Sequence, residues 1–389
     1  MNEQNKETAK SYRFDTRCIC GDRAAAHPYG AVAMPIFQTA MYSHPGIGQS
    51  TGFDYSRESN PTRSCLEEVI RDLDGAYDSI ACASGMAAIS LCMTLFLPGD
   101  HLVCSRDLYG GSVRLFDQLE KMGLQFSYTD TSDLEKTEAL IRPETKALFI
   151  ETPSNPTMRI TDLRAIRALA DKHGLLVIAD NTFLSPYFQR PLELGADIAI
   201  QSATKFLCGH NDVIAGVVSV RSAELSQKLR FNYKTDGGCL SAFDSYLLLR
   251  GIKTLALRQD RQQANAIRIA AWLKTCPKVK DVYYPGLPDH PGYEVQKSQA
   301  SGFGSMISFH TDSAETARGL LEHIQLILYA ESLGGVETLL TYPMLQTHGD
   351  VPKEIRDELG ITDTFLRMSV GIENADDLIA DLEQAFAKL

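Results

Sequence analysis

Long apolar runs and an excess of positive charge are both missing from this sequence. No stretch approaches the roughly 18 apolar residues of a membrane-spanning helix, and the start, MNEQNKETAKSYRF, lacks the apolar segment of a signal peptide. The 38 lysines and arginines are outnumbered by 49 aspartates and glutamates, so the net charge is -11. These features argue against membrane and nucleic-acid partners and predict a cytoplasmic protein with a small-molecule ligand.

Paired cysteine motifs are missing as well. The nine cysteines are scattered singly, without the spacing of zinc or redox sites, so we expect reduced thiols that pack as small apolar groups. The chain has neither a Walker A pattern nor a strand-linked G-x-G-x-x-G. The sequence therefore predicts no metal site and gives no support to nucleotide binding.

An alternation of helix-like and strand-like segments begins near residue 64 and is typical of α/β proteins. At 389 residues the chain exceeds the roughly 250 to 300 residues at which single cores stop growing. We predict an extended arm over 1–60, a large domain over 61–250 and a C-terminal domain over 251–389, with one long helix over 243–274 that bridges the last two. The expected strands are 79–83, 101–105, 146–151, 175–180, 197–202 and 215–220, then 305–309, 327–332 and 365–372.

Two hydroxyls and an amine follow the strand in DIAIQSATKFLCGH, residues 197–210. Open α/β sheets bind ligands at the carboxyl ends of their strands. Ser202 and Thr204 share one side of an extended segment, where both can donate to a phosphate. Burying an ammonium is costly, so Lys205 must be paired, solvated or covalently used, for example by the aldehyde of pyridoxal phosphate. An ordinary surface lysine is the alternative.

An acid and a helix start add to this pattern. Asp180 ends LLVIAD and is followed by NTF, which includes Thr182. A buried carboxylate keeps its charge opposite a protonated nitrogen such as that of a pyridoxal ring, although a cap or turn role is equally open. In CASGMAAI the backbone N-H groups of Gly85 and Met86 begin a predicted helix and offer an anion site.

Other polar and aromatic residues follow strands or lie in the arm. Tyr109 follows the strand 101–105 and can stack on a flat ring. Arg367 lies in an apolar C-terminal strand, where it either binds a substrate carboxylate or forms a salt bridge. The remaining candidates are Tyr55 and Arg57 as a phosphate clamp in the arm, Glu151 and Asn155 near the turn PSNP, with Asn155 facing the cofactor's phenolic oxygen, and Ser332 beside Arg367.

Taken together, these stretches resemble one family over nearly the whole chain, namely the Cys/Met-metabolism pyridoxal phosphate enzymes. The matching stretches are YSRESNPTR, SGMAAI, DLYGG, ETPSNPT, DNTF, SATKFLCGHND, AESLGGVET and RMSVGIE, in the family's order. The resemblance implies an aspartate-aminotransferase-like fold of type I, with a mostly parallel seven-stranded sheet and a smaller α/β domain. It also implies a homotetramer of two dimers whose active sites are shared between subunits.

The resemblance assigns roles to the candidates. It implies that Lys205 forms the Schiff base, that Asp180 pairs with the pyridine nitrogen and that Tyr109 stacks on the ring. Arg367 would bind the substrate α-carboxylate, and Asn155, Glu151 and Ser332 would line the substrate site. Phosphate would be held by Gly85, Met86, Ser202 and Thr204, joined by Tyr55 and Arg57 of the neighbouring subunit.

Finer features of the resemblance indicate which reaction of the family to expect. Gly111 stands where methionine γ-lyases tend to carry cysteine. Arg114 resembles the pattern of γ-synthases and γ-lyases, in which a second arginine suits a substrate with a distal carboxylate or ester. Thr341 stands where γ-lyases usually have an acid. We therefore expect γ-replacement on an O-acylhomoserine by cysteine or sulfide. A cystathionine β- or γ-lyase, or a methionine γ-lyase, is the alternative, and a non-catalytic binding module is disfavoured because Lys205 and Asp180 are both present.

Overall fold

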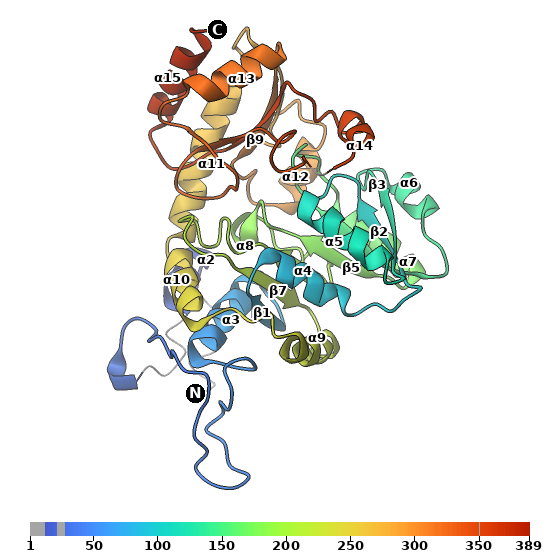
Figure 1. Ribbon diagram of the computed structural model, residues 1–389, viewed down its shortest axis with the longest axis vertical. Coiled ribbons are helices and arrows are strands. Elements are labelled where there is room, and N and C mark those ends of the chain that lie inside the picture. Colours follow the sequence, from blue (N-terminus) through green and yellow to red (C-terminus); the bar gives the residue numbers. More distant parts are fainter. Residues whose placement is uncertain (1–11, 22–27, 350) are drawn as a thin grey trace.

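The computed structural model describes residues 12–21, 28–349 and 351–389 and contains two sheets (Figure 1). The larger sheet has seven strands in the order β1-β7-β6-β5-β4-β2-β3, and only β7 runs antiparallel to its neighbours. This confirms the predicted α/β class and the mostly parallel sheet. The strands are β1 (Asp78–Cys82), β2 (His101–Ser105), β3 (Gln125–Thr129), β4 (Thr145–Glu151), β5 (Leu176–Asp180), β6 (Ile198–Gln201) and β7 (Gly216–Val220).

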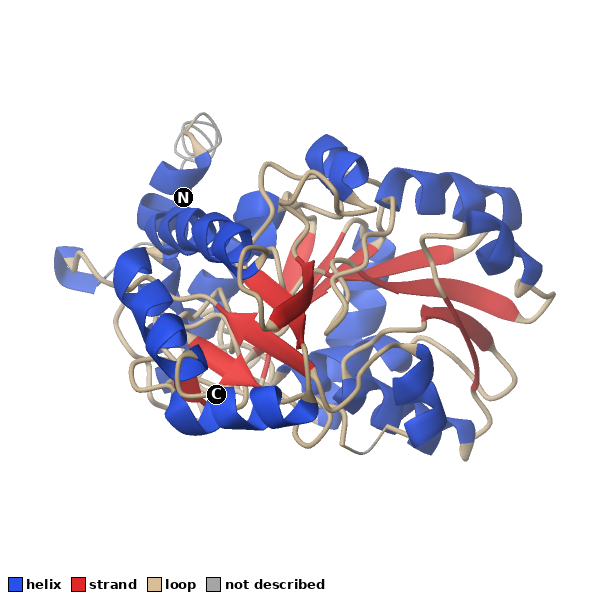
Figure 2. Cartoon of the chain, turned by 90° about the horizontal axis from the view of Figure 1, so that it is seen from above, coloured by secondary structure: helices blue, strands red, loops and turns tan. Residues whose placement is uncertain are grey.

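Helices cover both faces of this sheet, as Figure 2 shows from above. Alternate residues of β2 therefore enter different cores: Leu102 and Cys104 pack on one side and Val103 on the other. A sheet buried on both faces gives the continuous apolar strands on which the prediction rested. The helices are α3 (Pro61–Asp74), α4 (Gly85–Met93), α5 (Gly110–Glu120), α6 (Leu134–Ala139), α7 (Leu163–His173), α8 (Ser185–Phe188), α9 (Ala223–Asp236) and α10 (Ala242–Ile252).

The second sheet has five strands in the order β10-β11-β12-β9-β8. Its strands are β8 (Val279–Tyr283), β9 (Met306–Thr311), β10 (Leu328–Tyr329), β11 (Leu339–Thr341) and β12 (Phe365–Ser369). The helices that accompany it are α11 (Leu255–Leu273), α12 (Tyr293–Gln299), α13 (Ala314–His323), α14 (Lys353–Glu358) and α15 (Ala375–Phe386). A division near residue 250 agrees with these two sheets and stays a prediction.

The single long helix expected over 243–274 is wrong, because α10 ends at Ile252 and α11 begins at Leu255. The Thr254 hydroxyl donates to the Gly251 carbonyl at 3.1 Å and so takes the place of a helical hydrogen bond. Arg258, which is only 3% exposed, donates to Gly251 and also to the carbonyls of Phe206 and Leu207. The break therefore lets one guanidinium bind the loop that carries Lys205.

The described part of the arm contains the short helices α2 (Phe14–Cys20) and η2 (Pro28–Gly30) and then an irregular segment that leads to α3. In Figure 1 this segment, drawn in blue, projects away from both sheets. Residues 1–11 and 22–27 of the predicted arm lie outside the described residues. Within the described ranges, no helix is long and apolar enough to cross a bilayer.

Candidate active site

A pocket of about 310 Å³ collects most of the predicted site residues. It lies where β4, β5 and β6 end, and the segment after β10 and a residue of β12 complete it from the second sheet. The position agrees with the rule that open α/β sheets bind ligands beyond their carboxyl ends. The predicted residues that line it are Gly85, Met86, Tyr109, Glu151, Asn155, Asp180, Thr182, Ser202, Thr204, Lys205, Ser332 and Arg367.

Lys205 occupies a turn just after β6, and its amine donates to the Ser332 hydroxyl at 2.6 Å. Burial lowers the pKa of Lys205 to about 8, and the positive charge of Arg367 adds to the effect. A substantial fraction of this amine is thus neutral near physiological pH. A neutral, partly enclosed amine can act as a nucleophile or as a base.

Asp180 and Glu151 lie opposite each other on neighbouring parallel strands. Asp180 Oδ1 accepts hydrogen bonds from the backbone N-H and the hydroxyl of Thr182, at 2.9 and 2.6 Å. Glu151 Oε2 accepts from the Tyr109 N-H at 2.9 Å. Burial raises the pKa of both carboxyls, and for Glu151 the charge of Asp180 raises it further. A cationic group bound beside Asp180 would restore its charge.

The helix start at α4 forms a cradle without a charged side chain. Ser84 caps the helix by accepting from the Ala87 N-H, which leaves the N-H groups of Gly85 and Met86 without an intrahelical acceptor. A Cβ added at Gly85 would lie 2.8 Å from the Cβ of Ser202, so the cradle requires glycine there. The Thr204 hydroxyl also lines the pocket and bonds the backbone of Ala215. Such a helix start suits a phosphate.

Arg367 is only 1% exposed and still borders the pocket. Its guanidinium donates to Asn155 Oδ1 at 2.7 Å and to the Ser332 carbonyl at 3.1 Å, whereas its buried Nε has no partner among the described residues. Burial lowers the pKa of Arg367 to about 10. Within the described chain no carboxylate forms an ion pair with it, which disfavours the salt-bridge alternative and leaves a donor for a ligand carboxylate.

Three predicted residues do not reach the pocket of their own chain. The Arg57 guanidinium donates to the Lys234 carbonyl and lies over the Tyr55 ring, 5.4 Å from its centroid. Arg114 lies on an exposed position of α5. Tyr55 is 44% exposed on the projecting arm. Their predicted roles therefore depend on another subunit or stay untested.

Several residues that line the pocket were not predicted from the sequence. Glu331 is an exposed acid directly before Ser332. Its place in the stretch AESLGGVET, next to a predicted site residue, was the sequence feature that could have indicated it. Thr347 comes from a segment without helical or strand periodicity, and no pattern indicated it. Thr341 does not line the pocket; it is buried and donates to the Ala330 carbonyl at 3.0 Å. The other pocket-lining residues that were not predicted are Ser84, Ile89, Phe183, Ile214 and Leu333.

Comparison with known proteins decides the family. The model of the Cys/Met metabolism PLP-dependent enzymes matches residues 15–387, which is nearly the whole chain. The chain belongs to this family. Its cofactor is therefore pyridoxal phosphate, and the pocket fits that group: a glycine-lined helix start suits the phosphate, and a desolvated amine and a buried acid suit the aldehyde and the ring nitrogen.

Similar members of the family differ in the reactions for which they are named. Cystathionine gamma-lyase of Bacillus subtilis is 48% identical over 96% of this chain and 99% of the relative. Cystathionine gamma-synthase/O-acetylhomoserine (thiol)-lyase of the same organism is 47% identical over 92% of each chain. The crystal structure of cystathionine gamma-lyase from Lactobacillus plantarum complexed with L-serine has a TM-score of 0.95 at 44% identity, covering 97% of this chain and 99% of that one. The chain is thus a trans-sulfuration enzyme, with synthases and lyases at similar distance.

Proposed function

We propose that the chain catalyses γ-replacement on an O-acylhomoserine, with cysteine as the incoming thiol to give cystathionine or sulfide to give homocysteine. The observation that supports an amino-acid substrate is the joint presence, in one pocket, of a Lys205 amine with a lowered pKa and a buried Arg367. An amino-acid substrate needs both, since one group moves its protons and the other holds its carboxylate. Support for γ-replacement comes from the 47% identity to a protein named cystathionine gamma-synthase/O-acetylhomoserine (thiol)-lyase.

The cofactor residues follow from the pocket. Lys205 would hold the cofactor covalently at its aldehyde, Asp180 would face the ring nitrogen and Tyr109 would stack on the ring. Gly85, Met86, Ser202 and Thr204 would hold the phosphate, while Thr182 orients Asp180 through its two hydrogen bonds. When bound, the cofactor withdraws electrons from the substrate Cα.

The protein residues supply proton transfer and orientation. Lys205, once released from the cofactor, would take the Cα proton and carry it along the substrate, guided by the Ser332 hydroxyl at 2.6 Å. Arg367, held by Asn155, would bind the α-carboxylate through its free Nε. Glu151 would fix Tyr109 by accepting from its backbone N-H.

A second candidate is the cleavage of cystathionine. It is favoured by the 48% identity to a protein named cystathionine gamma-lyase and by Glu331, whose negative charge at the pocket suits the distal ammonium group of cystathionine. Cystathionine β-lyase activity belongs to the same candidate, since relatives with that name are 45% identical. Methionine γ-lyase activity is less favoured, because a Cβ at Gly111 would lie 2.4 Å from the Tyr109 ring and leave no room for cysteine.

We also propose that the site is completed in a homotetramer. Tyr55 and Arg57 lie on the projecting arm, outside the pocket of their own chain, and the phosphate cradle has no cationic side chain of its own. A neighbouring copy that inserts this arm would bring a guanidinium to the phosphate.

The deciding experiment gives the purified, cofactor-loaded enzyme O-acetyl-L-homoserine with and without L-cysteine, and in parallel L-cystathionine alone. Cystathionine that forms at the expense of 2-oxobutanoate when cysteine is present supports γ-replacement. Inert O-acetylhomoserine with rapid breakdown of cystathionine overturns it in favour of a lyase, and pyruvate or 2-oxobutanoate then identifies the bond that is cut. O-succinyl-L-homoserine and sulfide, tested in the same assay, determine the acyl group and the thiol.

A further inference from the structure

Two of the nine free thiols, Cys82 and Cys239, face each other across a short antiparallel bridge. Cys82 is the last residue of β1, and Cys239 lies in the segment between α9 and α10. The hydrogen bonds on either side run from Ala83 N-H to the Gly238 carbonyl at 2.9 Å and from Leu240 N-H to the Ala81 carbonyl at 3.3 Å. Both bonds flank the cysteine pair, so the two cysteines form a non-hydrogen-bonded pair.

This kind of pairing has a definite geometry. Directly opposed residues of an antiparallel pair point to the same face, and in a non-hydrogen-bonded pair their Cα atoms are about 4.5 Å apart. Disulfides need Cα atoms roughly 4.4 to 6.8 Å apart. Cys82 and Cys239 therefore meet the backbone requirement for a disulfide without movement of either segment.

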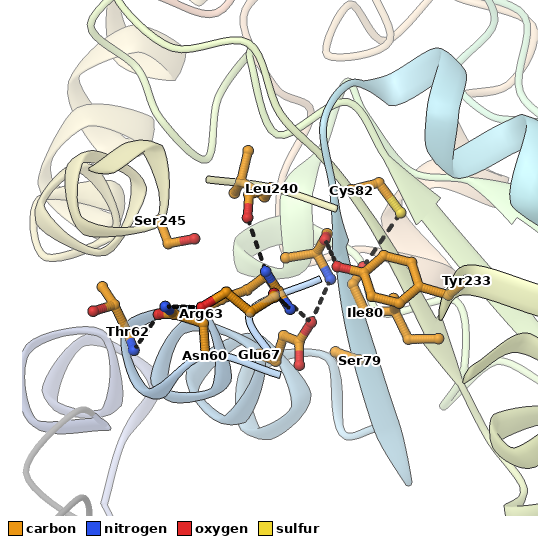
Figure 3. A network of polar contacts seen from close by, with 12 residues as sticks. Asn60, Thr62, Arg63, Glu67, Ser79, Ile80, Cys82, Tyr233, Leu240 and Ser245 are labelled. Atoms are coloured by element: carbon orange, nitrogen blue, oxygen red, sulfur yellow. Dashed lines mark hydrogen bonds and ion pairs between the residues drawn. The ribbon is translucent and has the colours of Figure 1, made fainter. Parts of the chain in front are cut away.

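Both cysteines belong to one apolar cluster, but solvent reaches Cys239 more readily than Cys82. Cys82 is 1% exposed and Cys239 is partly exposed and packs against the same apolar cluster. Burial raises the pKa of the Cys82 thiol. Figure 3 shows Cys82 at the end of its strand beside Tyr233 and near Leu240, which follows Cys239 in the chain.

We infer that Cys82 and Cys239 form a modification site, a two-electron thiol/disulfide pair within one chain. The accessible Cys239 thiolate attacks a small disulfide such as glutathione disulfide, which forms a mixed disulfide and releases one thiolate. The Cys82 sulfur then attacks Cys239 Sγ, loses its proton to solvent and releases the second glutathione. Two protein thiols are thereby oxidised, and one glutathione disulfide is reduced to two thiols.

The bridge would tie together two segments next to the pocket. Cys82 precedes the cradle at Ser84 and Gly85 by two and three residues. On the other side, a Cβ at Gly237 would lie 3.4 Å from Arg57 Cδ, and Gly238 lies near Ala87 of α4. Oxidation therefore stiffens the region between the cradle and the segment that contacts Arg57. This inference does not depend on which reaction the enzyme catalyses.

The test uses the full chain, fully reduced and then exposed to glutathione disulfide before the remaining thiols are alkylated. We expect two fewer alkylated thiols than the nine of the reduced chain, a mass lower by two hydrogens before alkylation, and a fragment that joins Cys82 to Cys239. Dithiothreitol should restore all nine. Amide hydrogen exchange at Ala83 and Leu240 should slow in the oxidised chain, which reports on stiffening without reference to activity.

Matched variants separate this pair from other thiols. Cys239→Ser should have the same number of alkylated thiols before and after oxidation, because it cannot form the disulfide. Cys276→Ser, which removes another partly exposed thiol, should still form the disulfide between Cys82 and Cys239. Nine thiols after oxidation, glutathione that stays on Cys239, or a bridge between two chains on a non-reducing gel would each overturn the inference. If Cys239→Ser does not fold, fragment mapping of the wild-type chain and of Cys82→Ala gives the answer.

Discussion

At the scale of single residues, the reactivity of Lys205 is governed by its burial. Since burial lowers its pKa from 10.5 to about 8, we expect the apoprotein to bind pyridoxal phosphate covalently at a rate that rises with pH and levels off just above pH 8. The measurement is the shift in cofactor absorbance that covalent attachment causes, followed after rapid mixing across a pH series. Lys205→Ala should show no such shift and should lose turnover by at least roughly 10²- to 10⁴-fold.

Glu331 provides the control for this pH profile. Its carboxylate raises the pKa of Lys205 against the effect of burial, so Glu331→Gln should move the midpoint to lower pH. A wild-type midpoint near the ordinary 10.5 would contradict the idea that the amine is desolvated.

The buried guanidinium of Arg367 leads to a second residue-level prediction. Arg367→Lys keeps the positive charge but cannot hold Asn155, the Ser332 carbonyl and a ligand carboxylate at once. Loss of a charged hydrogen bond costs about 1.5 to 3 kcal/mol, so KM for amino-acid substrates should rise roughly 10- to 100-fold. Steady-state kinetics with O-acetylhomoserine or cystathionine measures this, and circular dichroism checks the fold. An unchanged KM would indicate a purely structural arginine.

Most pocket residues could be predicted from the sequence because they follow apolar strands. Asp180 and Glu151 end β5 and β4, and Lys205 follows β6, so position alone directed them to one edge of the sheet. Thr347 enters from an irregular segment whose path depends on tertiary packing. Arg57 lies on the arm, outside the pocket of its own chain, and its role in a neighbouring site stays a prediction.

At the scale of elements, α3 ends on a buried acid without a cation bonded to it. Asp74 accepts from Gln201 Nε2 at 3.1 Å and from the Ser219 hydroxyl, and burial raises its pKa from 3.8 to about 7. Because the native state binds the proton more tightly than the unfolded chain, this carboxyl stabilises the fold fully only at low pH. Its contribution to stability falls as pH rises from about 4 to about 7 and changes little above that.

Asp74→Asn removes this titration while it keeps a side chain that can both donate and accept. We expect the urea midpoint of Asp74→Asn relative to wild type to increase between pH 5 and pH 8, which unfolding followed by fluorescence at each pH measures. Asp236→Asn, at the exposed end of α9, serves as the matched control and should show no such trend. A parallel shift of both curves with pH would refute the assigned role of Asp74.

Two of the strands that sequence reasoning missed lie at sheet edges. β3 is an edge strand with an exposed first residue and only two buried positions, so it lacks the apolar run of the inner strands. β8, at the edge of the second sheet, has no fully buried residue. The short inner strand β11 was also missed, and the strand expected over 327–332 shrinks to β10, because Ser332 takes a positive φ of 89° and contacts Lys205 instead of continuing the ladder. The inner strands of the large sheet were predicted well, since burial on both faces gives them continuous apolar runs.

At the scale of the whole molecule, the pocket is built from distant parts of the chain. The large sheet supplies Lys205 and Asp180, the second sheet supplies Arg367, and Tyr55 and Arg57 lie on the arm, outside the pocket of their own chain. Among the described residues, the cradle of Gly85, Met86, Ser202 and Thr204 includes no cationic side chain, and the proposed oligomer would place the Arg57 guanidinium of one chain in the cradle of its neighbour. Under this proposal the activity depends on two chains.

Shared sites can be tested by combining two inactive variants. Lys205→Ala lacks the amine and Arg57→Ala lacks the arm guanidinium, so each should be inactive or strongly impaired alone. In a dimer that contains one chain of each kind, one site carries both changes and the other carries neither, because the two residues come from different chains. Random mixing should therefore restore roughly a quarter of the wild-type activity. Co-expression of the two variants in equal amounts, followed by assay of the whole purified population, measures this. Activity no higher than that of the single variants would mean that Arg57 serves its own chain or no site at all.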